Sequence, residues 1–161
     1  MPTPPYILEL RRSHGHGLLL LPGVCGVVLR DDLEPGRRHL LLVRRSDTGA
    51  WTLPAGIVEP GEQPATAIER ELLEETRVVA EAERLAWVGA DPELVYPNGD
   101  RCQYLTTVFR CRYVSGEAGV GDEESTEVAW ADLATLPPLD QNEQRRLRYA
   151  LEDTERTRFE R

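Results

Sequence analysis

The sequence predicts a single domain of the α/β or α+β class, built as a sandwich of sheet and helices. Three observations lead to this prediction. The chain has 161 residues, of which 40% are hydrophobic, so it can bury the core of one domain. Its apolar runs are short or alternate as strands do, and two stretches repeat at the helical period. Neither an internal repeat nor a low-complexity linker divides residues 1–161.

The first strands are expected near the N-terminus. Residues 18–29 (LLLLPGVCGVVL) predict two buried strand segments that are interrupted at Pro22-Gly23, and residues 39–45 (HLLLVRR) predict the next strand. The turn-like residues 31–38 lie between them, so a hairpin is favoured.

A helix is expected in the middle of the chain. Residues 46–51 predict a loop, and residues 51–62 predict a loop with short extended pieces. Pro64 follows at a position that the first turn of a helix tolerates. The helical pattern continues from there to about Thr76.

The C-terminal half is predicted to contain three more strands and a second helix. Asn98-Gly99 is a strong signal for a turn between the first two of these strands. The expected strands and the terminal helix cover, in order, residues 82–92, 102–114, 127–133 and 140–153.

The N-terminal residues 6–10 (YILEL) are also strand-like. We expect them to pair within the sheet or with a second subunit, which would make the protein a homodimer. Residues 1–17 lack a basic start followed by a long apolar run, so no signal peptide is predicted. No run approaches the roughly 18 apolar residues of a membrane span, so no membrane partner is expected.

Charge and cysteine content narrow the classes of function. The net charge of −9 argues against nucleic acid as a partner, because binding it needs an electropositive surface. Metal ions can still invert the charge locally and admit an anionic substrate. The chain has no lysine, so arginine or histidine must make any contact of a basic side chain with phosphate. Cys25, Cys102 and Cys111 are widely spaced, which favours reduced thiols in a cytoplasmic protein.

Acidic residues are concentrated at the end of the central helix, although like charges at helical spacing repel each other. At about 100° per residue, Glu71, Glu74 and Glu75 fall within an arc of roughly 100°. This arc lies at the edge of the apolar stripe that faces the sheet, whereas a merely solvated face would lie opposite the core. The position favours a cleft in which carboxylates converge on a hard cation, Mg²⁺ or Mn²⁺.

The same stretch carries a resemblance to a known family. Residues 56–78 resemble the Nudix box, G-x5-E-x7-R-E-U-x-E-E-x-G-U. Six fixed positions match, and they are occupied by Gly56, Glu62, Arg70, Glu71, Glu74 and Glu75. At background frequencies, the chance of this match at one start position is about 10⁻⁷ or less. The chain therefore resembles the Nudix (MutT-like) hydrolases.

The resemblance implies a mixed β-sheet sandwiched between helices, with the box as a loop–helix–loop. Similar proteins hydrolyse a diphosphate bond in a nucleoside diphosphate linked to another group, such as a nucleoside triphosphate, ADP-ribose or a nucleotide sugar. Water attacks phosphorus while divalent cations neutralise charge on the bridging and leaving oxygens. The implied partner is a small-molecule nucleotide, and the implied cofactor is Mg²⁺, with Mn²⁺ as a substitute.

Carried over by position, the resemblance also assigns roles to the box residues. Glu71, Glu74 and Glu75 are the implied metal ligands, and one of them or a later acid orients or deprotonates the water. Gly56 is expected to let its backbone approach the metal. Arg70 is expected to orient a box carboxylate through an ion pair.

The match has one departure, because Arg77 stands at the last glycine of the box. A glycine just past a helix commonly adopts a left-handed conformation, and another residue there costs on the order of 1 kcal/mol. The position is not a ligand, so the chemistry is expected to survive, while the loop geometry after the helix is open. Glu62, nearer the start of the box, is expected to brace the loop rather than to bind metal.

Four residues outside the box are candidates for substrate binding. Arg44, Arg45 and Arg101 are candidates for phosphate contacts, with an ordinary surface arginine as the alternative for each. Because Arg44 and Arg45 are neighbours on a strand, at most one is expected to face the substrate. Tyr96 lies in a loop between strands and is a candidate for stacking on a base, with turn packing as the alternative.

The acidic segment 121–130 and two cysteines leave further hypotheses open. Glu124 and Glu127 are candidates for an additional metal ligand or base, with a solvated turn as the alternative. A catalytically silent module that senses a nucleotide is the main competing function, although such a binder has no need of every box glutamate. An isomerase of isoprenoid diphosphates would need a catalytic cysteine, for which Cys25 and Cys102 are available.

Overall fold

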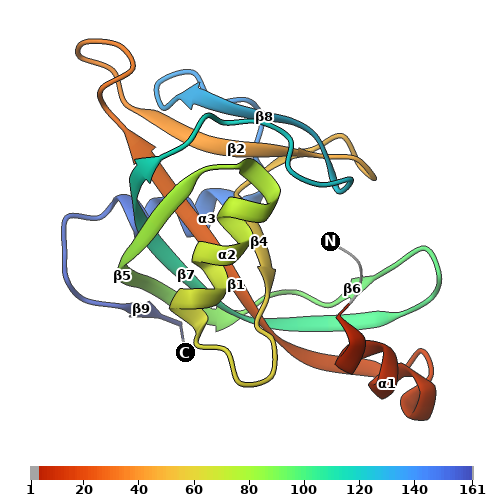
Figure 1. The fold of residues 1–161 in the computed structure, drawn as a ribbon. Helices are drawn as coiled ribbons and strands as arrows, with labels where there is room; N and C mark the ends of the chain where they lie inside the picture. Colours follow the sequence, from red (N-terminus) through yellow and green to blue (C-terminus); the bar gives the residue numbers. More distant parts are fainter. Residues whose placement is uncertain (1–3, 161) are drawn as a thin grey trace.

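The computed structural model describes residues 4–160, and within them it shows one mixed sheet of nine strands with three helices (Figure 1). In chain order the elements are α1 (Pro5–His14), β1 (Leu18–Arg30), β2 (His39–Arg45), β3 (Trp51–Thr52), β4 (Ala55–Ile57), α2 (Pro64–Thr76), β5 (Val79–Ala90), β6 (Leu94–Val95), β7 (Arg101–Ser115), β8 (Ser125–Asp132), α3 (Gln141–Leu151) and β9 (Arg158–Phe159). The main order across the sheet is β3-β2-β1-β7-β5-β9, while β4, β6 and β8 pair with β1, β7 and β2. The predicted α+β class is confirmed.

The sheet is organised around β1 and β7, which run parallel along Leu18–Leu29 of β1. β5 pairs antiparallel with β7, and Gly99 in the connection between them has a φ of +88°, as expected for the Asn98-Gly99 turn. β2 pairs with the end of β1, which confirms the hairpin, and with β8 along its whole length.

Residues 18–29 form part of one continuous strand, so the expected break at Pro22-Gly23 is wrong. The carbonyl of Pro22 accepts a hydrogen bond from the Val58 N–H on the β4 side of the strand. The missing N–H of Pro22 faces the same side, and therefore removes no bond from the β7 ladder. At Gly23 a Cβ would lie 2.9 Å from the Thr106 hydroxyl oxygen, so the glycine serves close approach between strands.

Two hydrophobic cores lie on the two faces of the sheet, one under α2 and the other under α3 (Figure 1). Neighbouring residues of β1 and β2 alternate between these cores. The α2 core includes Val24, Val28, Leu41, Ile68 and Leu72. The α3 core includes Cys25, Val27, Leu40, Leu42, Trp87, Leu147 and Ala150. The sheet is thus sandwiched between helices, as the resemblance implied.

The N-terminal segment forms the helix α1, so the prediction of a strand at residues 6–10 is wrong. Five alternating residues are too few to separate the strand period from the helical one, and the adjacent prolines favour a first helical turn. Ile7 is buried beside Leu21 and Cys102, which attaches α1 to the extended ends of β1 and β7. Residues 6–10 therefore offer no strand to the sheet or to a second subunit, and the homodimer stays a prediction without that basis.

The other predicted elements are confirmed with small shifts at their ends. α2 begins at Pro64 and ends at Thr76, and α3 lies inside the predicted terminal helix. β6 and β9 are two-residue strands that the sequence pattern did not indicate. All three cysteines are free and buried. In the part of the chain that the structure describes, no helix has the length and apolar character needed to cross a membrane.

Candidate active site

Helix α2 directs two box glutamates into the protein and one toward solvent. Glu71 and Glu75 are 1% and 7% exposed, whereas the side chain of Glu74 is 47% exposed. The inward pair is four residues apart, which places both carboxylates on one face of the helix. Two buried carboxylates on one helix face are unusual in a stable core, because acidic residues are seldom fully buried unless they are paired.

Arg70 connects the loop before α2 to the helix carboxylates. Its guanidinium donates to Glu62 at 2.9 and 3.0 Å, to Glu71 at 2.9 Å and to Glu74 at 3.1 Å. The ion pair lowers the pKa of Glu62, and Glu62 also accepts a hydrogen bond from the Glu59 N–H at 3.2 Å. Arg70 therefore fixes three carboxylates at once.

The strand β4 supplies the other side of the site. The Ala55 N–H donates to Glu75 Oε2 at 3.3 Å. A Cβ at Gly56 would lie only 2.0 Å from the Glu71 carboxyl carbon, so any side chain there would displace Glu71. The space that Gly56 leaves is occupied by the carboxylate of Glu71. The approach of the Gly56 backbone to a metal stays a prediction.

Burial raises the pKa of both inward-facing carboxyl groups. The pKa of Glu71 rises to about 7, mainly through burial, while Arg70 acts in the opposite direction. The pKa of Glu75 rises to about 8, through burial and then through the charges of Glu71 and Asp122. Carboxylates this poorly solvated need hydrogen bonds or nearby positive charge to be stabilised in their charged form, and a bound cation would supply such charge.

The carboxylates of Glu71, Glu74 and Glu75 fit a divalent cation in type, burial and charge, since Mg²⁺ and Mn²⁺ prefer oxygen ligands. Across residues 4–160, however, no three acidic, histidine or cysteine side chains already converge as a coordination sphere. Arg70 contacts two of the three glutamates instead.

The loop between β7 and β8 closes over the end of α2. The Gly119 N–H donates to the Thr76 carbonyl and the Gly121 N–H to the Glu75 carbonyl, both at 3.0 Å. A Cβ at Gly121 would lie 1.8 Å from the Glu74 carbonyl oxygen, so only glycine permits this approach. The loop thereby carries the residues that follow it to the buried carboxylates of the helix.

Two acids of this loop lie near Glu75. Both Asp122 and Glu124 act through their charge to raise the pKa of Glu75. The sequence analysis selected Glu124 but not Asp122. The available sequence signal for Asp122 was Gly121, the glycine directly before it. Glu127 lies on β8 instead, where it pairs with Arg44 at 3.5 Å.

A cavity of about 640 Å³ lies beside these acids and contains two of the four predicted substrate-binding residues. It is lined by Arg45, Ser46, Asp47, Tyr96, Asp122, Glu123 and Glu124. Arg45 donates to both oxygens of Asp47, at 2.9 and 2.6 Å. The Tyr96 hydroxyl lies 2.9 Å from the Tyr104 hydroxyl, which fixes the ring at the cavity wall.

The two remaining arginine candidates do not line this cavity. Arg44 points to the other face of β2, where it pairs with Glu127 and donates to the Gly49 carbonyl. Arg101 pairs with Glu93 at 2.6 Å on the exposed β6–β7 side of the molecule. Only one member of the Arg44-Arg45 pair faces the cavity, as the alternation along a strand requires.

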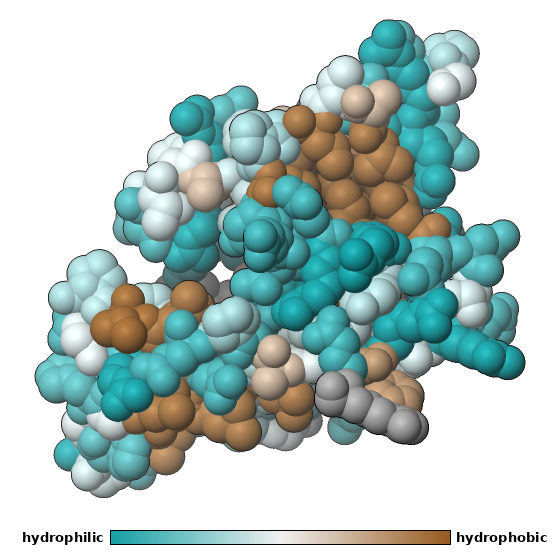
Figure 2. Space-filling model, turned by 180° about the vertical axis from the view of Figure 1, so that it is seen from behind, coloured by the Kyte–Doolittle hydropathy of each residue, from teal (hydrophilic) through white to brown (hydrophobic). Residues whose placement is uncertain are grey.

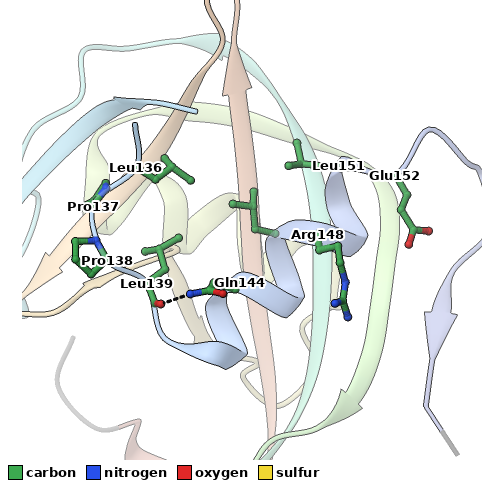
Figure 3. A pocket seen from close by; sticks show the side chains of 9 residues that line it. Leu136, Pro137, Pro138, Leu139, Gln144, Arg148, Leu151 and Glu152 are labelled. Carbon is green, nitrogen blue, oxygen red and sulfur yellow. Dashed lines mark hydrogen bonds between the residues drawn. The ribbon is translucent and has the colours of Figure 1, made fainter. Parts of the chain in front are cut away.

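A second cavity, of about 560 Å³, lies on the α3 side (Figure 3). Side chains of α3 and of the segment before it surround it, including Leu136, Pro137, Leu139, Leu147 and Leu151. Figure 2 shows that apolar side chains also gather on this rear face of the molecule. Gln144, Arg148 and Glu152 are the polar lining residues, and none of the box glutamates takes part. This cavity carries no arrangement of groups suited to hydrolysis.

Comparisons with known proteins agree on one family. A family model described as the NUDIX domain matches residues 19–151. A MutT-like protein of Streptomyces ambofaciens is 41% identical over 107 residues, which are 66% of this chain and 60% of that protein. An ADP-ribose pyrophosphatase of Methanocaldococcus jannaschii is 30% identical over 138 residues, which are 83% of this chain and 75% of that protein. The chain thus spans less than two thirds of the first relative.

Solved structures show the same architecture. The crystal structure of a MutT NUDIX hydrolase from Burkholderia pseudomallei superposes with a TM-score of 0.64 at 27% sequence identity. The superposition covers 81% of this chain and 98% of that one. The residues that match the family model, 19–151, include both α2 and α3.

Proposed function

The chain belongs to the NUDIX domain family, and we propose that it hydrolyses a diphosphate bond in a nucleoside diphosphate linked to another group, with Mg²⁺ as cofactor. The observation that carries the proposal is the buried pair Glu71 and Glu75, on a box helix whose fixed acidic positions are all occupied. A helix selected only for stability would carry apolar residues there, since burying carboxylates without a cation is unfavourable. The arrangement is explained if a divalent cation completes the site.

The residues of the site would hold and orient the cation. Glu71, Glu74 and Glu75 offer carboxylate oxygens, while Arg70 and the Ala55 N–H restrict how these side chains move. When bound, Mg²⁺ would neutralise charge on the diphosphate and activate the attacking water. The fixed surroundings keep the carboxylates in place, which is the contribution of outer residues in metal sites generally.

An acid of the β7–β8 loop would accept the proton from the attacking water. Asp122 and Glu124 are the candidates, because their charges act on Glu75 and both residues line the cavity. A general base must reach both the water and the solvent that finally takes the proton. The edge of the cavity meets that requirement better than the buried helix positions do.

The charges of the cavity favour a substrate with two phosphates over one with three. Of its lining residues, Asp47, Asp122, Glu123 and Glu124 are acidic, and Arg45 is the basic one. A third phosphate would add negative charge that this lining repels. Tyr96 offers an aromatic face to a base. The name of the Methanocaldococcus jannaschii relative, an ADP-ribose pyrophosphatase, supports the same class of substrate.

The two alternative functions are less well supported. A silent sensing module would not need Glu71 and Glu75 buried and ionisable beside Gly56. An isomerase would need a reactive thiol at the site. Cys25 is fully buried in the α3 core, where burial raises the pKa of its thiol, and Cys102 is buried under α1.

The experiment that tests the proposal is phosphate or nucleotide release from a panel of substrates. The panel contains nucleoside triphosphates, ADP-ribose, nucleotide sugars and dinucleoside polyphosphates, each with Mg²⁺, with Mn²⁺ and with chelator. We expect metal-dependent turnover of a two-phosphate substrate, such as ADP-ribose, and its loss in Glu74→Gln. Tight nucleotide binding without any turnover would instead support the sensing module.

A further inference from the structure

Residues 53–58, which contain β4, pass from one hydrophobic core to the other. Leu53 is buried in the α3 core, while Val58, five residues later, packs in the α2 core. Between them lie Ala55 and Gly56, which contact the carboxylates of Glu75 and Glu71. The position of this short segment therefore influences where the carboxylates of Glu71 and Glu75 lie.

A buried carboxylate on the opposite helix holds the start of this segment. Glu143 of α3 is 5% exposed, and its Oε2 accepts a hydrogen bond from the Leu53 N–H at 2.7 Å. The β2–β3 pairing ends at Thr52, so the Leu53 N–H donates to the Glu143 carboxylate instead of to a neighbouring strand. Without that acceptor, a buried donor would be left unsatisfied, which is costly.

Glu143 is itself fixed from several sides. Asp140, the residue that caps α3, accepts a hydrogen bond from the Glu143 N–H at 2.9 Å. Arg146 donates to the other carboxylate oxygen of Glu143 at 2.6 Å and to Asp91 at 2.6 Å. Thr106 of β7 donates to the same oxygen of Asp91. The carboxylate that accepts from Leu53 is therefore linked through Arg146 to Asp91, directly after β5, and to Thr106 of β7, as well as to its own helix.

We propose that Glu143 is a positioning residue that fixes Leu53–Gly56, and through it the carboxylates of Glu75 and Glu71, for binding of the divalent cation. The inference rests on the proposed function only in naming the cation. The main alternative is that the three residue pairs between β4 and β1 hold the segment without help, so that Glu143 contributes only to stability. Buried ion pairs are often replaceable by apolar residues without loss of stability, so stability alone is a weak reason for this cluster.

The test compares variants by Mn²⁺ binding, followed through the electron paramagnetic resonance signal of free Mn²⁺. Glu143→Leu removes the acceptor for the Leu53 N–H, while Glu143→Gln keeps an acceptor oxygen and loses the charge. Leu147→Ala is the matched control, since it lies on the same helix and in the same core but not on this segment. All proteins are measured well below their unfolding temperatures, with thermal unfolding recorded in parallel.

We expect the dissociation constant for Mn²⁺ to rise about tenfold in Glu143→Leu and less in Glu143→Gln, as for other outer-shell residues of metal sites. Leu147→Ala should stay within about twofold of the parent, because its effect is confined to packing. Amide hydrogen exchange at Ala55, measured without metal, should be faster in Glu143→Leu and unchanged in the control. This second readout needs neither cation nor substrate.

Several results would overturn the proposal. The first is that folded Glu143→Leu has the Mn²⁺ affinity and the rate of Ala55 amide exchange of the parent protein. Another is an equal loss in Leu147→Ala at matched stability. If Glu143→Leu does not fold, unchanged values in folded Glu143→Ala, which also removes the acceptor for the Leu53 N–H, overturn it as well. Absence of hydrolysis in the parent protein, with the Mn²⁺ and exchange results as expected, would reject the proposed function and leave the positioning role in place.

Discussion

Two groups of buried acids lie on opposite faces of the sheet, and they differ in how their charge is balanced. On the α3 side, Arg146 lies between Glu143 and Asp91 and donates to both. On the α2 side, Arg70 contacts Glu71, whereas burial and neighbouring acids dominate the surroundings of Glu75. The first group has two cations for its two acids, because Arg145 also lies 3.7 Å from Asp91. The second group is short of positive charge.

This difference separates a structural cluster from a functional one. A balanced cluster is complete when the chain folds, and it stabilises or positions what it contacts. An unbalanced cluster is held together against repulsion and becomes favourable when a cation is supplied from outside. Each prediction below removes or adds one charge in one of the two groups.

The largest expected effect is on hydrolysis. In Glu75→Gln, kcat should fall on the order of 1,000-fold, because the variant loses a charged ligand that stabilises the transition state through the cation. Steady-state rates with Mg²⁺ measure this loss. Glu69→Gln is the matched control, since Glu69 lies on the same helix and accepts from the Ala82 N–H. An equal loss of activity in the control would remove the distinction between the box acids and other helix acids.

The second prediction removes a cation from the balanced group. Arg146→Met leaves Asp91 and Glu143 buried without their shared partner, so the free energy of unfolding should fall by about 3 kcal/mol. Denaturant unfolding measures the change. The control is Arg148→Met on the exposed side of α3, for which a change within about 0.5 kcal/mol is expected. If both variants behave alike, the buried charges of this cluster are not coupled through Arg146.

The third prediction concerns the pH dependence of stability without metal. The folded-state pKa of Glu75, about 8, lies above the ordinary value of 4.5, so the folded protein binds this proton more readily than the unfolded chain. The contribution of Glu75 to stability is therefore fully present below about pH 4.5, and it is lost as the pH rises to about 8. The loss should be on the order of 2 kcal/mol, because movement of nearby groups and entry of water reduce the full linkage value.

Thermal unfolding in chelator at pH 5 to 8.5 measures this dependence. Glu75→Gln does not titrate at this position, so its stability should fall less over the same range. Added Mg²⁺ should restore stability at pH 8 in the parent protein and much less in the variant. Parallel curves for the two proteins in chelator would show that Glu75 does not carry a destabilising charge in the folded state.

The sequence predicted the local parts of the site and missed the parts that come from distant segments. Spacing within one helix was enough to group Glu71, Glu74 and Glu75, because helical geometry follows directly from residue number. It did not indicate that Glu74 is half exposed while the other two are buried. No local pattern links Glu143 to Leu53, which are 90 positions apart, or Asp122 to Glu75. Such contacts depend on how α3 and the β7–β8 loop pack on the sheet.

The errors in secondary structure have a similar origin. Residues 6–10 alternate like a strand, yet they form α1, since burial of Ile7 beside Leu21 and Cys102 decides between two periods that five residues cannot separate. Pro22-Gly23 suggested a break, but the strand continues because its neighbours need neither an N–H nor a side chain there.

The smallest expected effect is at the one departure from the box. Arg77 has a φ of +61° and a ψ of +12°, the left-handed conformation that a glycine adopts after a helix. Arg77→Gly should therefore raise the free energy of unfolding by about 1 kcal/mol, while Arg77→Ala, which keeps a Cβ, should not. Hydrolysis should change less than twofold in both, since Arg77 lies outside both acidic groups. If Arg77→Gly instead lowers stability, the arginine side chain is contributing contacts that outweigh its backbone strain, and the departure is then an adaptation of this loop.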